Sequence, residues 1–251
     1  MSTTRRVGDL FYEMNFSSRT LHSYHLGKSS YESISDTFDL LPDEIPADYF
    51  GSKLYVEELG KQLNIPTIAR IEINLADHSI NHQNQFEYFL SINANEISAV
   101  LNALSELGVF ILQIEGIDPL KKDALRSLIE YSSKHEFFFE IHSSLFELPE
   151  WLIHLSLPQK QNIIIFTSIY SVNKNINDLL TGVYNSGSIV LENAEKLVKA
   201  GYKVIVQTPL SKINFHERHD LVESIAKIGA IHQYTWPSDQ DSLPRIIDDI
   251  N

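Results

Sequence analysis

Short apolar runs separated by amphipathic stretches dominate the chain from about residue 67 onward. Runs of this length, bounded by glycine or polar residues, are typical of buried strands. We predict six of them: Ile68–Leu75, Val109–Ile114, Phe137–Ile141, Asn162–Thr167, Lys203–Gln207 and Ala230–Tyr234. The intervening stretches have apolar residues at helical spacing. We predict helices over Ile97–Leu107, Lys121–Lys134, Glu150–Leu155, Ser188–Ala200 and Phe215–Ile228.

Strands that alternate with helices belong to an α/β fold, because a helical crossover returns the chain parallel to the preceding strand. Six units are fewer than the eight of a closed barrel. The pattern therefore leaves two architectures open. One is a doubly wound open sheet, and the other is a partial (β/α)6 TIM-like barrel with a lateral gap.

The first 65 residues lack this rhythm and are rich in tyrosine, phenylalanine and serine. Alternation in Leu10–Phe16 and in Leu21–Leu26 predicts a β-hairpin, and Val56–Leu63 predicts a helix. We expect a small aromatic-rich N-terminal extension over residues 1–65, a barrel over 66–236 and a C-terminal tail over 237–251.

Charge and hydropathy exclude several classes of partner. The chain of 251 residues carries 20 Lys plus Arg against 33 Asp plus Glu, a formal net charge of −13, so it would repel a phosphate backbone. Its only adjacent basic pairs are Arg5-Arg6 and Lys121-Lys122. No apolar run approaches the roughly 20 residues that span a bilayer. We expect a cytoplasmic protein that binds neither nucleic acid nor membrane.

The chain contains no cysteine. This excludes disulfides, thiolate zinc sites, a cysteine nucleophile and a cysteine-ligated iron–sulfur cluster within the chain.

A turn after the second predicted strand has the sequence Glu115-Gly116-Ile117-Asp118-Pro119-Leu120. It resembles a Gly-Gly-Glu-Pro turn of the radical S-adenosylmethionine (SAM) family, in which that turn meets the amino group of the methionine moiety. Ile117 stands at the second glycine and Asp118 at the glutamate. The resemblance implies that Gly116, Asp118 and Pro119 are the remnant of a SAM-binding turn. The alternative is a common strand-to-helix turn in which the aspartate caps the following helix.

The segment Gly187–Gly201 is similar to the fourth helix of peptide-modifying members of this family. The resemblance covers roughly residues 67–235. In the family, the loop after the first strand carries Cys-x-x-x-Cys-x-x-Cys, which ligates a [4Fe–4S] cluster. The corresponding loop, Ala76–Phe89, supplies no thiolate.

The resemblance implies a catalytically degenerate protein, a pseudoenzyme that lacks the cluster needed to cleave SAM. It implies an accessory or binding role in ribosomal-peptide maturation, with a peptide substrate or a partner maturation enzyme as ligand. We expect no bound cofactor, although SAM could be held without being cleaved.

Two other classes of function stay open. His78, His82, Glu115 and His142 fall at or beyond predicted strand C-termini, where barrel sites gather. They could ligate a metal through nitrogen and oxygen, as in a metal-dependent hydrolase or isomerase. The chain could also be a structural subunit of a larger assembly.

Overall fold

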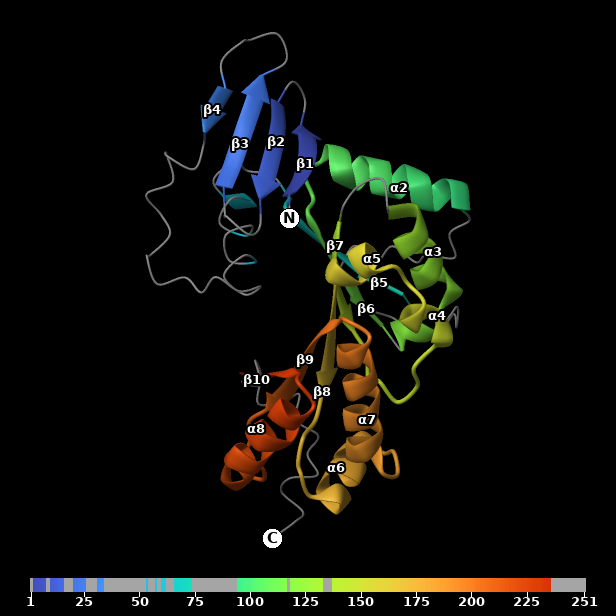
Figure 1. Ribbon diagram of the computed structural model, residues 1–251, viewed down its shortest axis with the longest axis vertical. Helices are drawn as coiled ribbons and strands as arrows, with labels where there is room; N and C mark the ends of the chain where they lie inside the picture. The colour runs from blue at the N-terminus through green and yellow to red at the C-terminus, as the bar shows by residue number, and fades with distance from the viewer. Residues whose placement is uncertain are drawn as a thin grey trace, which may run out of the picture. The chain divides into compact units, whose positions relative to one another are not determined.

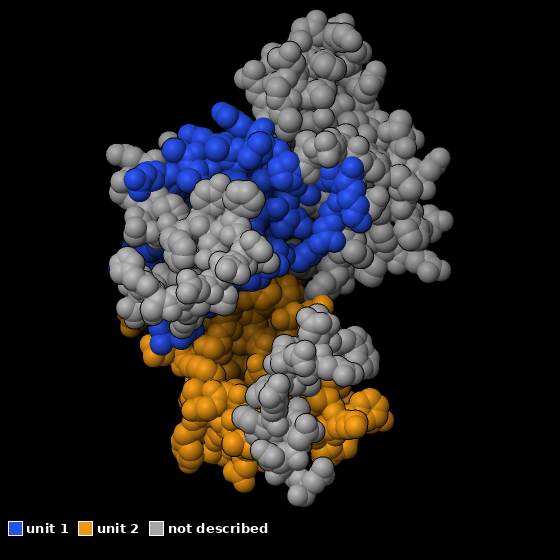
Figure 2. Space-filling model, turned by 180° about the vertical axis from the view of Figure 1, so that it is seen from behind, with its two compact units in different colours: residues 1–140 blue, residues 141–251 orange. Residues whose placement is uncertain are grey.

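The structure is a computed structural model that describes residues 2–7, 10–15, 20–25, 31–33, 53, 57, 60–61, 66–73, 94–116, 118–132 and 137–235. The chain divides into two compact units, residues 1–140 and 141–251 (Figure 2). The division falls inside strand β7 (Phe138–His142) of the β/α repeat, and the domain boundaries expected at residues 65 and 236 stay predictions. No helix in the described part of the chain is long and apolar enough to cross a membrane.

An antiparallel sheet of four strands begins the first unit (Figure 1). Its strands, in spatial order, are β1 (Ser2–Val7), β2 (Leu10–Asn15), β3 (Thr20–His25) and β4 (Tyr31–Ser33). The segments predicted as a hairpin are β2 and β3, with Tyr12 opposite Ser23. An isolated hairpin is only marginally stable, and the two flanking strands supply the additional pairing.

The β/α repeat forms a second sheet of six strands. They are β5 (Ile68–Glu72), β6 (Ile111–Glu115), β7 (Phe138–His142), β8 (Ile163–Ser168), β9 (Lys203–Pro209) and β10 (Ile231–Thr235). β5 pairs with β6, and β9 with both β8 and β10, in parallel. The order runs consecutively from β5 to β10. A doubly wound sheet reverses its strand order at a switch point, so the consecutive order selects the unclosed, partial barrel.

Helical segments separate the strands (Figure 1). They are α2 (Ala94–Glu106), η2 (Pro119–Lys121), α3 (Asp123–Tyr131), α4 (Glu150–Ile153), α5 (Leu157–Gln161), α6 (Lys174–Thr181), α7 (Ser186–Lys199), η4 (Phe215–Glu217) and α8 (Arg218–Lys227). The predicted helices of the β/α repeat correspond to α2, α3, α4, α7 and α8, and the predicted helix Val56–Leu63 lies mostly outside the described residues. The short helices α5 and α6 were not predicted.

Within the first unit, strands β5 to β7 have one apolar face and one face on which polar side chains lie beside buried apolar ones. Ile71, Leu112 and Phe139 belong to the apolar face and are at most 7% exposed. Helices α2 and α3 contact each other and contribute the fully buried Leu101 and Leu125 to the same core. Phe137, Phe138 and Phe139 are all buried, as expected for a strand covered on both faces.

Candidate functional site

The Gly116 turn follows β6 and presses against the end of β5. Gly116 has a φ of +132°, and a Cβ at this position would lie 2.3 Å from the carbonyl oxygen of Ile73. The Ile73 amide donates a hydrogen bond of 2.8 Å to the Glu115 carbonyl, which holds the two segments together. Only glycine combines this φ with such a close backbone approach. The turn that resembles the SAM-binding motif is therefore tightly built.

Asp118 and Pro119 continue this turn. Asp118 has a left-handed φ of 52° and stands at the N-cap position of η2, but its side chain makes no capping hydrogen bond. Its carboxylate lies 3.2 Å from the Lys121 ammonium, so the interpretation of Asp118 as a side-chain cap is wrong. Pro119 is buried at the first turn of η2. The Asp118 carboxylate thus lies in the same turn as Gly116. That these residues are the remnant of a SAM-binding turn stays a prediction.

A row of polar side chains crosses β5, β6 and β7 in the first unit. Arg70 lies opposite Gln113 in the β5–β6 register, and the Gln113 amide Nε2 donates to Glu140 Oε2 at 2.6 Å. Lys53, which comes from the N-terminal 65 residues, places its ammonium 2.9 Å from the same oxygen. Glu115 lies 3.4 Å from Arg70. The polar face of these strands thus carries five interacting groups.

Glu140 is the most deeply buried member, with only 1% of its surface exposed. Burial raises the pKa of Glu140 to about 7, because the charged form loses its hydration. Contacts with the Lys53 ammonium and the Gln113 amide favour the charged form and oppose that shift. Burial also lowers the pKa of Lys53, as does the charge of Arg70, whereas Glu57 and Glu115 attract the ammonium and act the other way.

The four candidate metal ligands are not assembled by the described residues. His78 and His82 lie outside them. Glu115 is paired with Arg70 in the first unit. His142, in the second unit, stacks on Phe166 with ring centroids 4.7 Å apart. No group of three or more His, Cys, Asp or Glu that could hold a metal occurs among the residues that the structure describes.

Buried polar residues of the second unit hold the loop that follows β8. Asn177 of α6 accepts hydrogen bonds from the Tyr170 and Ser171 amides at 2.9 and 3.3 Å and donates to Ser186 Oγ at 2.7 Å. Glu217 accepts from Ser171 Oγ at 2.6 Å. These hydrogen bonds form a rim at the carboxyl end of β8.

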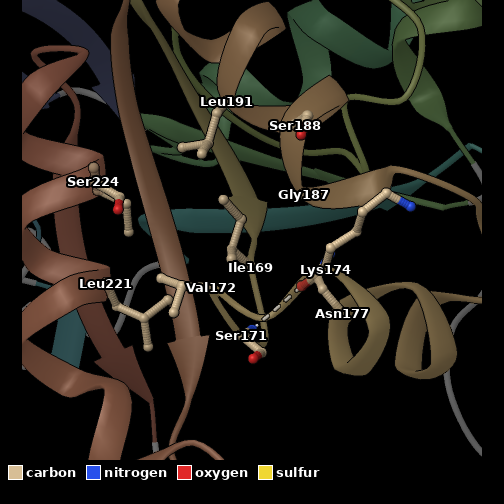
Figure 3. A pocket seen from close by; sticks show the side chains of 11 residues that line it. Ile169, Ser171, Val172, Lys174, Asn177, Gly187, Ser188, Leu191, Leu221 and Ser224 are labelled. Atoms are coloured by element: carbon tan, nitrogen blue, oxygen red, sulfur yellow. Dashed lines mark hydrogen bonds between the residues drawn. The ribbon is translucent and has the colours of Figure 1, made fainter.

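A cavity of about 120 Å³ lies next to this rim. Figure 3 shows Ile169, Leu191 and Leu221 around it, with the dashed bond between Asn177 and Ser171 at its edge. Its lining combines aliphatic with polar side chains. The sequence pattern did not single out this cavity, because its walls come from three separate segments, 169–177, 187–191 and 221–225.

The donor set of the chain does not fit a [4Fe–4S] cluster. Such clusters are held by thiolates, and the chain has none. No step of a reaction can therefore be assigned to a cluster ligated by these residues.

The sequence matches no protein-family model and no curated protein. Solved structures match its fold. SuiB from Streptococcus suis has a TM-score of 0.61 and 12% identity over 96% of this chain and 62% of the SuiB chain. SuiB bound to the precursor peptide SuiA has a TM-score of 0.53 and 12% identity over 90% of this chain and 61% of that one. The enzyme anSMEcpe with bound AdoMet (SAM) and the Cp18Cys peptide has a TM-score of 0.50 and 16% identity over 67% of this chain and 50% of that chain.

SuiB and anSMEcpe are peptide-modifying radical SAM enzymes. At these identities the likeness concerns the fold, and this chain spans about three fifths of SuiB. The expectation drawn from the Gly116 turn and the Gly187–Gly201 helix is confirmed at that level. The chain has the partial-barrel fold of peptide-modifying radical SAM enzymes, and it has no cysteine with which to ligate their iron–sulfur cluster.

Proposed function

We propose that this chain is a catalytically degenerate radical SAM-like protein that serves as an accessory in ribosomal-peptide maturation. It binds a precursor peptide or a partner maturation enzyme and performs no SAM cleavage of its own. One observation carries the proposal. The fold of SuiB is matched along 96% of a chain that contains no cysteine.

Peptide binding is supported by the structural neighbours. SuiB has been solved with the precursor peptide SuiA, and anSMEcpe with the peptides Cp18Cys and Kp18Cys. The match to the SuiA complex extends over 90% of this chain. Peptide binding does not require the cluster, because peptide recognition depends on shape, charge and hydrogen bonds rather than on electron transfer.

The polar face of β5–β7 supports the loss of the original chemistry. Lys53, from outside the β/α repeat, is bonded to Glu140 there. A charged side chain of the protein itself thus occupies part of the face that carries the Gly116 turn. This agrees with a site that no longer accommodates the full cofactor set.

The test of the proposal has two measurements. Protein purified anaerobically and supplied with iron and sulfide should give no [4Fe–4S] absorption or paramagnetic signal, and no 5′-deoxyadenosine from SAM. Stoichiometric cluster formation with SAM cleavage would overturn the degenerate assignment.

The second measurement concerns the binding role. Fluorescence anisotropy with labelled peptides encoded beside the gene, and co-purification with neighbouring maturation enzymes, should give saturable binding to at least one of them. Absence of saturable binding to all of them would overturn the accessory role while leaving the cluster result intact.

A further inference from the structure

The two oxygens of the Glu140 carboxylate have different surroundings. Oε2 accepts hydrogen bonds from Lys53 and Gln113, whereas Oε1 is buried and has no hydrogen-bond partner. A buried carboxylate oxygen without a donor loses its hydration and gains nothing in return. Such a group is an acceptor that lacks its donor.

Lys53 is an internal occupant of this acceptor. It is 87 residues from Glu140 in the sequence, and 24% of its side chain is exposed. The carboxylate thus already accommodates an ammonium at the end of a four-carbon chain, at 2.9 Å. The dimensions of the site are those of an aminoalkyl group.

The neighbouring charges favour a cation over an anion at this site. Glu57, Glu115 and Glu140 provide three carboxylates, against the two cations Lys53 and Arg70. An anionic ligand would face the excess of carboxylates. A cationic ligand that replaced Lys53 would keep the charge balance, and the released ammonium would still be attracted by Glu57 and Glu115.

We propose that Glu140 is the acceptor of a binding site for a primary ammonium group on an alkyl chain, and that Lys53 occupies this site until the ligand displaces it. An ammonium has three N–H donors, so one ligand can bond both carboxylate oxygens. The inference deepens the proposed function and rests on it for one point, that the natural ligand is a lysine side chain of a bound peptide.

Two variants of Lys53 allow an empty site to be compared with a site that is filled by an uncharged side chain. Lys53→Ala removes the internal occupant and opens the aminoalkyl slot. Lys53→Met removes the charge but keeps the slot filled with a side chain of similar length. The probe is n-butylammonium chloride, whose charge resembles that of lysine, with an ordinary pKa of about 10.4.

Binding of n-butylammonium is measured by calorimetry and by chemical-shift changes at about pH 8, above the value of about 7 to which burial raises the pKa of Glu140. Lys53→Ala should bind n-butylammonium about tenfold more tightly than the wild type. In the wild type Lys53 occupies the site most of the time, so its removal raises the fraction of molecules in which the site is open to the ligand. Lys53→Met should bind no better than the wild type. Equal affinities of the Ala and Met variants would overturn the proposal.

Further controls test charge and position. Glu140→Gln, in the Lys53→Ala background, should abolish binding, and n-butanol should not bind at all. Lys61→Ala, a change of an exposed lysine in the same segment, should leave the affinity at the wild-type value. Binding of n-butanol equal to that of n-butylammonium would show an apolar slot and overturn the proposal. If Glu140→Gln does not fold, the comparison of Lys53→Ala with Lys53→Met still decides.

Peptide arms identify the source of the ammonium. A peptide that contains an unmodified lysine and has an acetylated N-terminus should compete with n-butylammonium. The same peptide with Nε-acetyllysine in place of lysine should not. Equal competition by the two peptides would overturn the assignment to lysine. Because n-butylammonium needs neither peptide nor partner enzyme, the ammonium site and the accessory role can fail independently of each other.

Discussion

Replacing Gly116 by alanine tests the tight turn after β6. The new Cβ would lie 2.3 Å from the Ile73 carbonyl oxygen, whereas ordinary contact begins at 3.4 Å, so one backbone must move by about 1 Å. A φ of +132° costs a residue with a side chain about 1–3 kcal/mol. Weakening the bond from the Ile73 amide to the Glu115 carbonyl adds about 1 kcal/mol. We expect Gly116→Ala to lower the free energy of unfolding by about 3 kcal/mol.

Gly182→Ala is the matched control for this prediction. Gly182 also has a positive φ, +69°, but a Cβ there would meet nothing within 4 Å. It should cost only about 1 kcal/mol, from backbone conformation alone. Urea denaturation followed by circular dichroism gives both values. If Gly116→Ala is no less stable than Gly182→Ala, the turn relaxes freely and the reasoning about its close packing is wrong.

Two further substitutions test the buried polar groups. Since burial raises the pKa of Glu140 from 4.5 to about 7, the contribution of this carboxyl group to stability should be fully present below pH 4.5, and up to about 3 kcal/mol of it should be lost as the pH rises through 7. Urea midpoints should show this slope in the wild type and not in Glu140→Gln, and equal slopes would contradict it. Asn177→Ala leaves the Tyr170 and Ser171 amides without their acceptor and removes one hydrogen bond of the Ser186 hydroxyl, and it should cost about 2–4 kcal/mol, whereas Asn175→Ala at an exposed position should be neutral. Thermal unfolding compares the two, and equal midpoints would refute the anchoring role.

The strands and long helices of the β/α repeat could be predicted because their apolar pattern spans many residues. The run Val109–Ile114 corresponds to β6, and Gly187–Gly201 contains most of α7. The sequence pattern could not distinguish a partial barrel from a doubly wound sheet. The two differ in the spatial order of their strands, which the hydrophobic periodicity does not determine. The resemblance carried by the Gly116 turn indicated the same fold.

The two missed helices had local signals that the hydrophobic period does not reveal. Ser156 and Gln159 form a capping box at the start of α5. Asn173 caps the first turn of α6 by accepting from two amides, and Gly182 ends that helix in a left-handed conformation. Helices of five and eight residues present too few apolar positions for a period to appear, so their caps are the better signal.

The central pair of the candidate site could be predicted only in part. Glu140 interrupts the apolar run that begins at Phe137, and an acidic residue inside such a run is a sequence signal for a buried carboxylate. Its partner Lys53 is 87 residues away, in a segment outside the β/α repeat. No local pattern relates the two, because their contact is a tertiary one.

The burial of Glu140 is difficult to explain as a device for stability. A buried ion pair gains little over an apolar pair of similar volume, because both charges lose their hydration. Here one carboxylate oxygen has no donor at all, and burial raises the pKa of Glu140 to about 7. A leucine at position 140 would be buried without that cost. Residues that lower stability in this way are typical of binding sites, where the missing partner is supplied by a ligand. The absence of cysteine therefore does not imply the absence of ligand binding on this face of the strands.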